Sequence, residues 1–244
     1  NNSHLYLESE PTQRPFYAPE AIRRDAIVYQ KYRLTDQLLE SALFDSVWYR
    51  YRYPDLIDST VDPFQHFLTQ KAFEGRDPGP LFSMTGYACF YGLENTENAV
   101  SHYLTHGRSN GYLPRPIFEG DKICRVDCKT ILLCAHQSAE QVFGAERSLV
   151  DILKGLVMAG LNVVVVLPGV GNEDYLAEIR KYAIAVAIVP FGWWMKCRPD
   201  YSQTIEFFSR LLEDYNVDRV YLNTLVLHEP ALAAKSMEIP VSVH

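Results

Sequence analysis

Residues 130–169 constrain the fold of this chain more than any other stretch. They begin with a short continuous apolar run at residues 131–133 and end with a second one at residues 163–167. Apolar runs without alternation are typical of strands that helices cover on both faces. Between the two runs, apolar residues recur at helical spacing, at Leu149, Ile152, Leu153, Leu156 and Val157. The stretch therefore predicts a strand, a helix ended by Gly160, and a second strand.

The same alternation continues to the end of the sequence. The further elements are expected as a helix at 173–181, a strand at 185–190, a helix capped by Asp200 or Ser202, a strand at 219–222, a helix at 229–237 and a strand at 240–244. Strands that alternate with helices predict an α/β fold, a doubly wound Rossmann-like open parallel sheet over residues 128–244. Right-handed crossovers bring the carboxyl ends of such strands to one edge, where ligands bind. The order of the strands is not predicted.

An internal repeat occupies residues 43–118. A repeat of this length indicates a duplicated helical hairpin whose units bury aromatic residues against each other. We therefore expect a small all-α repeat module over residues 43–120, joined to the sheet by a polar linker at 119–129. The matching positions include Leu43 with Leu81, Tyr49 with Tyr87, and His66 with His102.

Carboxylates and prolines mark the expected helix ends in and before this module. The first helix of the first copy is expected to begin near Asp45. The second is expected to begin at Asp62, a capping carboxylate followed by a proline. Residues 1–42 are expected to form an irregular arm and then a helix from Ile22, capped by Thr35 or Asp36.

The repeated histidines and aromatic residues each allow two interpretations. His66 and His102 could form a paired ligand site. A structural role, with the ring packed and one nitrogen bonded to a backbone carbonyl, is favoured because repetition of a core position explains the match without a ligand. The aromatic residues could likewise form a carbohydrate-stacking surface, although core packing is the simpler interpretation. Those of the first copy are Trp48, Tyr49, Tyr51, Tyr53, Phe64, Phe67 and Phe73.

Composition excludes several classes of function. The net charge of −7 divides about evenly between the two halves, so we expect no nucleic-acid partner. No apolar run approaches the roughly 18 residues of a membrane span, and the N-terminus lacks the features of a signal peptide, so a cytoplasmic location is expected. Cys124, Cys128 and Cys134 lack the spacing of a zinc site, so we expect no metal and interpret them as small buried hydrophobic residues.

Polar residues follow several of the predicted strands. His136 comes after the first strand, Asn223 and His228 after the fourth, and His244 at the end of the fifth. Because the carboxyl ends of parallel strands share one edge, these residues predict a ligand cleft there. A simpler alternative is that strand ends are merely where polar residues are permitted.

The segment Gly144-Ala145-Glu146-Arg147 lies where loop becomes helix. The unpaired N–H groups and the helix dipole at such a start favour an anion, and Gly144 lets a ligand approach the backbone. The segment is neither G-x-G-x-x-G nor a Walker loop, so no dinucleotide or nucleoside triphosphate site is indicated. A well-capped helix after a tight turn explains it equally well.

Three phrases of the sheet region carry a family resemblance. The motif H-x(7)-G-A-E-R-S-L-x-D-I-L-x-G-L, the strand V-V-V-V-L-P-G and the segment NTLVLHEPALAAKSMEIPVSVH resemble the N-terminal Rossmann-like domain of retaining GT-B glycosyltransferases of family 4. The repeat, with its phrases W-Y-x-x-x-Y-P-D and G-R-D-P-x-P-L-F, is similar to aromatic helical modules fused to bacterial polysaccharide glycosyltransferases, including those of rhamnan and O-antigen assembly. Together these resemblances cover nearly all of residues 43–244.

The resemblance implies a hexosyltransferase that moves a sugar from a nucleotide-sugar donor to a glycan or lipid-linked acceptor in bacterial surface polysaccharide synthesis, with no cofactor besides the donor. It places Gly144 and Ala145 on the loop beside the donor diphosphate, and His228 beside the transferred sugar. We expect His228 and His136 to be catalytic. The residues expected to bind donor or acceptor are Gly144, Ala145, Glu146, Arg147, Asn223, Glu229 and His244.

The resemblance also implies a second Rossmann-like domain with an E-x7-E motif, which residues 128–244 do not contain. We therefore expect this chain to be a piece of a longer protein that is inactive alone and needs that C-terminal domain as a partner. Peripheral attachment to the inner face of the membrane stays open. The alternatives are a non-catalytic carbohydrate or protein interaction module on an α/β scaffold, and a different sugar-phosphate enzyme.

Overall fold

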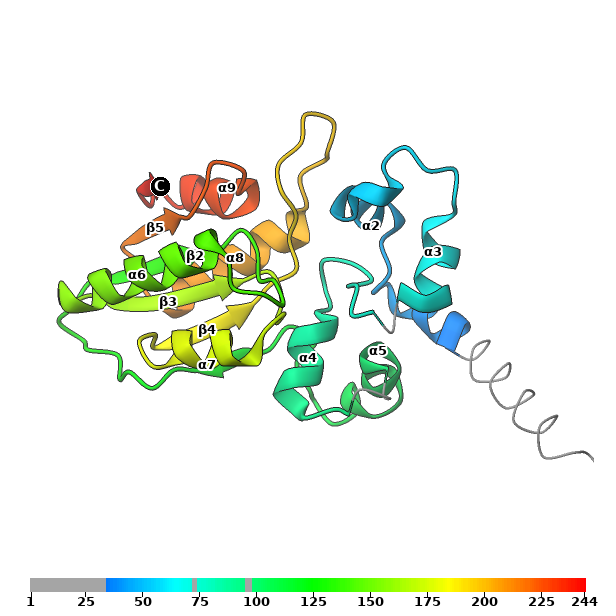
Figure 1. Ribbon diagram of the computed structural model, residues 1–244, viewed down its shortest axis with the longest axis horizontal. Helices are drawn as coiled ribbons and strands as arrows, with labels where there is room; N and C mark the ends of the chain where they lie inside the picture. Colours follow the sequence, from blue (N-terminus) through cyan, green and yellow to red (C-terminus); the bar gives the residue numbers. More distant parts are fainter. Residues whose placement is uncertain (1–33, 72–73, 95–97) are drawn as a thin grey trace, which may run out of the picture.

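The computed structural model describes residues 34–71, 74–94 and 98–244 (Figure 1). The N-terminal arm and the start of the helix expected from Ile22 lie outside the described residues. Residues 34–41 are helical. Thr35 and Asp36 therefore lie inside this helix, and the prediction that one of them caps it is wrong.

A six-stranded sheet with the order β1-β4-β3-β2-β5-β6 forms the C-terminal part of the fold. Neighbouring strands are parallel, except that β1 pairs antiparallel with β4. Counted by themselves, the parallel strands have the order 3-2-1-4-5 of Rossmann-type sheets, which confirms the predicted α/β fold. The strands are β1 (Ile117–Glu119), β2 (Thr130–Cys134), β3 (Asn162–Leu167), β4 (Ala185–Ile188), β5 (Arg219–Leu222) and β6 (Val241–Val243).

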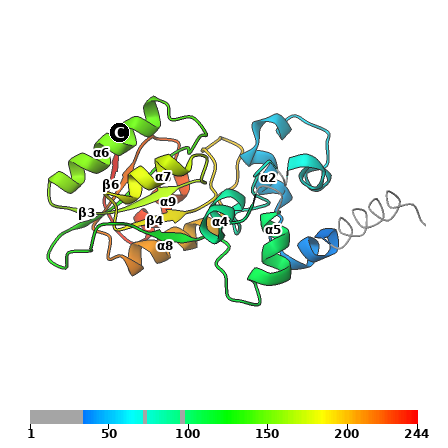
Figure 2. The ribbon, with the colours of Figure 1, turned by 60° about the horizontal axis from the view of Figure 1, so that its bottom comes forward.

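Helices cover both faces of the sheet, and Figure 2 shows α6 and α8 on opposite sides of it. Alternate strand residues serve the two cores: Leu133 and Val165 pack with one pair of helices, and Leu132 and Val164 with the other. This arrangement explains why the strand sequences are continuously apolar. The helices of the first core are α6 (Gly144–Met158) and α7 (Glu173–Arg180), and those of the second are α8 (Ser202–Asp214) and α9 (His228–Ser236).

The edge strand β1 was not expected from the sequence. The sequence places these residues at the end of the repeat and in the linker, yet Ile117 pairs with Ala187 and Glu119 with Ala185. Three residues carry too little periodicity to predict a strand. Directly after it, the Gly120 N–H donates to the Ile184 carbonyl at 3.0 Å, and a side chain at Gly120 would collide with the backbone of the neighbouring segment. The linker therefore begins inside the sheet.

Two other expectations about single residues are wrong. Helix α8 has Tyr201 at its N-cap position with no side-chain cap, so neither Asp200 nor Ser202 caps it. The cysteines are all free, but burial differs among them: Cys134 is buried in β2, whereas Cys124 is exposed. Cys124 is therefore not a small core residue.

The two sequence copies form matching pairs of helical segments. Asp45 and Asp62 accept hydrogen bonds from the backbone N–H groups of Trp48 and Gln65, which confirms the helix start near Asp45 and the cap predicted at Asp62. The first copy contains α2 (Ser46–Arg52), η1 (Pro54–Leu56), α3 (Pro63–His66) and its π-helical continuation η2 (Phe67–Lys71). The second contains α4 (Met84–Tyr91), α5 (Ala99–His102) and its π-helical continuation η3 (Tyr103–Gly107).

The repeats pack directly on the sheet region. The Thr85 hydroxyl accepts a hydrogen bond from the Val170 N–H at 2.9 Å, and Tyr201, just before α8, is buried within the repeat core. Figure 1 shows the connection from β4 to α8 rising between the sheet and α2. The end of this connection, at Tyr201, is therefore buried in the core of the repeats.

Candidate functional site

The strand order reverses between β2 and β5. The chain leaves β2 toward β3 on one side, and β5 toward β6 on the other, so a crevice is expected outside the carboxyl ends of this pair. His136 follows β2, Asn223 directly follows β5, and His244 directly follows β6. The His244 N–H donates to the Leu222 carbonyl at 3.0 Å, which holds it beside β5. Three of the predicted site residues thus share this edge.

Helix α6 begins at the same edge, with its first turn open. Phe143 occupies the N-cap position and its side chain has no acceptor, so the N-cap residue does not cap the amides of the first turn, although the Glu146 carboxylate accepts from the Phe143 N–H. The first intrahelical hydrogen bond is donated by Arg147 to the Phe143 carbonyl, at 3.1 Å. The amides of Gly144, Ala145 and Glu146 therefore lack intrahelical acceptors. A Cβ atom at Gly144 would meet nothing within 4 Å, so a ligand can approach the backbone closely at this residue.

Glu146 stabilises the loop that precedes α6. Its side chain is buried and accepts hydrogen bonds from the Gln137 amide at 3.0 Å and from the Phe143 N–H at 3.1 Å. Both carboxylate oxygens are thus engaged by the protein. We assign Glu146 to holding this loop, whereas Arg147, which is exposed, is free to meet a ligand.

Asn223 connects the end of β5 to the first turn of α6. Its Nδ2 donates to the Ala145 carbonyl at 3.4 Å, and its backbone N–H donates to the Cys134 carbonyl at 3.1 Å. The side chain is buried, and its Oδ1 has no partner among the described residues. The Asn223 Oδ1 is therefore a buried acceptor, beside the first turn of α6, that lacks a hydrogen bond among the described residues.

His136 is half-buried beside Trp193 from the β4–α8 connection. The Trp193 Nε1 donates to the His136 carbonyl at 2.9 Å, and the two rings are 5.9 Å apart. Burial lowers the pKa of His136, and the nearby Glu146 charge only partly opposes this. The imidazole is therefore neutral near pH 7, with one nitrogen that donates and one that accepts.

His228 begins α9, and its ring contacts the Asp200 carboxylate. The His228 Nε2 and Asp200 Oδ1 are 3.0 Å apart, and both side chains are partly exposed. Asp200, which the sequence suggested as a helix cap, instead fixes the ring that the resemblance placed near the transferred sugar. The adjacent connections also meet, because the Trp194 N–H donates to the Val226 carbonyl at 2.8 Å.

Glu229, the residue after His228, forms a buried ion pair with Arg198. The Arg198 Nη1 and Glu229 Oε1 are 2.6 Å apart, and neither side chain is accessible to water. The Arg198 guanidinium also lies 5.2 Å from the centre of the Tyr201 ring. Because Glu229 is fully buried, we assign it to anchoring the β4–α8 connection and not to ligand contact.

The sequence interpretation missed Trp193 and Arg198. Both lie in the connection at residues 189–201, which has no regular structure and hence no periodicity. The available signal was compositional: two consecutive tryptophans and an arginine followed by proline in a short loop. Loops at the carboxyl edge of a parallel sheet commonly carry binding residues.

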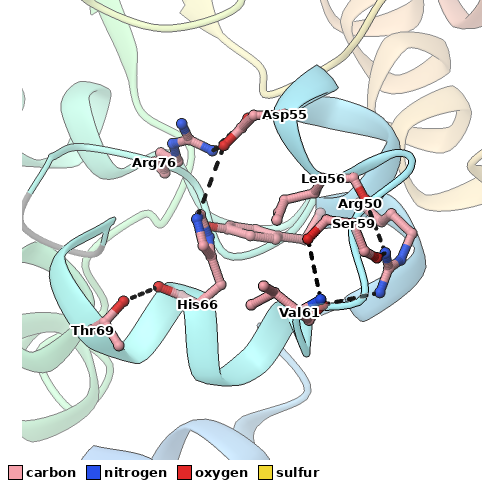
Figure 3. Close-up of polar contacts among 9 residues, drawn as sticks. Arg50, Asp55, Leu56, Ser59, Val61, His66, Thr69 and Arg76 are labelled. Carbon is pink, nitrogen blue, oxygen red and sulfur yellow. Dashed lines mark hydrogen bonds and ion pairs between the residues drawn. The ribbon is translucent and has the colours of Figure 1, made fainter.

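The repeated histidines lie in the repeat module and not at this edge. The Tyr49 hydroxyl meets the His66 Nδ1 at 3.1 Å, and in the second copy the Tyr87 hydroxyl meets the His102 Nδ1 at 2.9 Å. His66 also faces Asp55, with 4.0 Å between Nε2 and Oδ2 (Figure 3). Each histidine thus connects the two helices of its copy. The Nδ1 of each ring meets a tyrosine hydroxyl, a partner that the sequence interpretation did not name.

The aromatic residues of the first copy mostly form the module core. Trp48, Tyr49 and Phe67 are buried. The Tyr53 hydroxyl accepts a hydrogen bond from the Asp77 N–H at 2.6 Å, and its ring lies 4.5 Å from the Arg76 guanidinium. These rings are therefore occupied by the protein itself, as core packing requires.

Comparisons with known proteins find little similarity. No family model matches the chain, and no curated protein matches it significantly. Among solved structures, the chain is similar to a crystal structure of a glycosyltransferase from Rickettsia africae ESF-5, at 19% sequence identity and a TM-score of 0.34. The match covers 48% of this chain and 29% of that one, so it spans less than a third of that glycosyltransferase. The fold class of this chain is shown by its own strand order.

Proposed function

We propose that this chain is the N-terminal, acceptor-side part of a nucleotide-sugar glycosyltransferase. The observation that carries the proposal is the first turn of α6, whose amides at residues 144–146 have no intrahelical acceptor, at the reversal of strand order and beside His136 and Asn223. Helix starts of this kind bind phosphate groups through backbone amides and the helix dipole. A diphosphate leaving group is the anion that a nucleotide sugar would place there. The acceptor is a glycan or a lipid-linked glycan.

The residues of the edge supply the chemistry that transfer needs. Transfer breaks the bond between the anomeric carbon and the diphosphate oxygen, which keeps the electron pair, and forms a bond to an acceptor hydroxyl. The amides of Gly144 and Ala145 would stabilise the charge that develops on the diphosphate. Neutral His136 can accept the hydroxyl proton, and His228 can hydrogen-bond near the anomeric carbon. A second Rossmann-like domain would hold the nucleotide.

The location follows from the substrate. No described helix combines the length and the apolar character that crossing a bilayer would require. The proposed donor, a nucleotide sugar, is a cytoplasmic metabolite, so we place the enzyme in the cytoplasm. A lipid-linked acceptor would bring it to the inner face of the membrane. A role in bacterial surface polysaccharide synthesis belongs to the same proposal.

Replacing Gly144 with Ala is expected to weaken binding of inorganic pyrophosphate about tenfold without destabilising the protein. The new methyl group would occupy the free space before the first turn, while a helix gains up to about 1 kcal/mol from Ala over Gly. Isothermal titration calorimetry and thermal melting measure the two effects. Gly155→Ala is the matched control, because it lies in the same helix with equally free space around it. Equal affinity in both variants would contradict an anion site at the helix start.

Replacing His228 with Ala is expected to lower sugar transfer by the whole natural protein about tenfold or more, as for the loss of one transition-state contact. Folding should be unaffected because the side chain is partly exposed. Transfer is measured with radiolabelled nucleotide sugar. Asp200→Asn keeps the imidazole but removes the carboxylate that holds it, so a smaller loss of transfer is expected. Unchanged transfer in His228→Ala would contradict the catalytic role of His228.

A further inference from the structure

Two tryptophans of the β4–α8 connection are left in water. Trp193 is 52% exposed and Trp194 is 51% exposed, whereas Trp48, in the repeat core, is 1% exposed. Each residue therefore leaves about half of a large apolar surface in contact with water. Large exposed aromatic side chains that are close together mark contact surfaces.

The protein fixes Trp193 in position. Its indole N–H donates to the His136 carbonyl, and the backbone N–H of the next residue donates to the Val226 carbonyl. The Arg198–Glu229 ion pair fixes the far end of the connection. The connection is therefore attached to the loops after both β2 and β5. A ring held in this way loses little conformational freedom when a ligand packs on it.

The polar groups around Trp193 suit a ligand rich in hydroxyl groups. The neighbouring His136 is neutral near pH 7 and so offers one nitrogen that donates and one that accepts. A pyranose ring has one flat face of apolar C–H groups and a rim of hydroxyl groups. The C–H face can pack on an indole ring by dispersion, and the rim can bond to the polar side chains.

We propose that Trp193 is the stacking platform for a pyranose ring of the acceptor, beside His136 at the carboxyl edge of the sheet. The identity of this ring as an acceptor rests on the proposed function, but the stacking site does not. A site that combines one aromatic face with a few convergent polar groups is the usual form of a small-ligand site.

A membrane-insertion loop would use the same residue types differently. Such a segment would insert Trp193 and Trp194 alike and would gain from basic residues near an anionic surface. Here Arg198 is neutralised by Glu229, which leaves Lys196 as the basic side chain of the connection. The chain as a whole carries a net charge of −7. The bond from Trp193 to the loop after β2 favours the sugar site.

The test compares Trp193→Ala with Trp194→Ala, which removes an equally exposed ring from the same connection. Methyl glycosides of glucose, galactose, mannose and N-acetylglucosamine are titrated and followed by saturation-transfer difference NMR. Trp193→Ala is expected to raise the dissociation constant of the best-binding glycoside about tenfold, and Trp194→Ala less than about twofold. Trp48 remains in both variants as a fluorescent reporter of the intact repeat core.

Two results would overturn the platform: no binding of any glycoside to the wild-type chain, or equal loss in both variants. Sedimentation with phosphatidylcholine/phosphatidylglycerol vesicles that depends on both tryptophans would replace it with a membrane contact. Pyrophosphate titration separates the two proposals. Pyrophosphate binding without glycoside binding would reject the platform alone, and glycoside binding on Trp193 without pyrophosphate binding would reject the diphosphate site alone.

Discussion

Replacing Arg198 with Ala is expected to lower the free energy of unfolding by about 3–5 kcal/mol, the cost of leaving a buried charge without its partner. Glu229 is fully buried, and its Oε1 forms an ion pair with the Arg198 Nη1 at a distance of 2.6 Å. Without the guanidinium, the carboxylate must either stay charged in a low-dielectric interior or take up a proton. Both outcomes cost free energy relative to the wild-type protein. Urea unfolding followed by circular dichroism measures the loss.

A double variant separates the loss of charge compensation from the loss of the pair itself. Arg198→Met combined with Glu229→Leu removes both charges and keeps similar volume, so its stability is expected to lie within about 2 kcal/mol of the wild type. Glu229→Gln, which leaves the arginine unpaired, is expected to be destabilised in the same way as Arg198→Ala. If the single and double variants are equally stable, the pair is not buried as described.

The pair also connects stability to the proposed site. Arg198 belongs to the same connection as Trp193, and Glu229 follows His228 at the start of α9. Loss of the pair is therefore expected to release the connection locally before the sheet unfolds. Hydrogen exchange at the Trp194 amide, which donates to the Val226 carbonyl, reports this release directly.

The stability of this protein is expected to fall as the pH rises from about 4 to about 7, through one buried carboxyl group. Asp77 is 5% exposed, and its Oδ1 accepts a hydrogen bond from the Met84 N–H at 2.7 Å. Burial raises the pKa of Asp77 to about 7, and the charge of Arg52 and the hydrogen bond from Met84 oppose this only in part. Between these pH values the folded protein holds a proton that the unfolded chain has released.

The sign of the effect follows from proton linkage. The contribution of Asp77 is complete below its unfolded pKa of about 4 and is lost as the pH rises through about 7. The loss is on the order of 4 kcal/mol, since one pKa unit corresponds to about 1.4 kcal/mol. Asp77→Asn keeps an acceptor for the Met84 N–H but cannot ionise. Urea unfolding should show the variant similar to wild type at pH 4 and more stable by that order at pH 8. A difference between the two proteins that does not change with pH would contradict this assignment.

Local sequence patterns predicted most of the sheet. Continuous apolar runs located β2, β3 and β4, and helical spacing located α6. A strand buried on both faces needs consecutive apolar residues, and a helix buried along one stripe needs them at regular spacing. Part of the site followed as well. His136, Asn223 and His244 lie at one edge because parallel strands with right-handed crossovers leave their carboxyl ends on the same side.

The tertiary structure alone decided the strand order, the edge strand β1 and the partners of the site residues. Trp193 bonds to His136 across 57 residues of sequence, and Asp200 pairs with His228 instead of capping α8. Arg198, which pairs with Glu229, lies in an irregular connection whose sequence has no hydrophobic periodicity. Sequence patterns record what a residue does within its own element, whereas these contacts depend on which elements the folded core brings side by side.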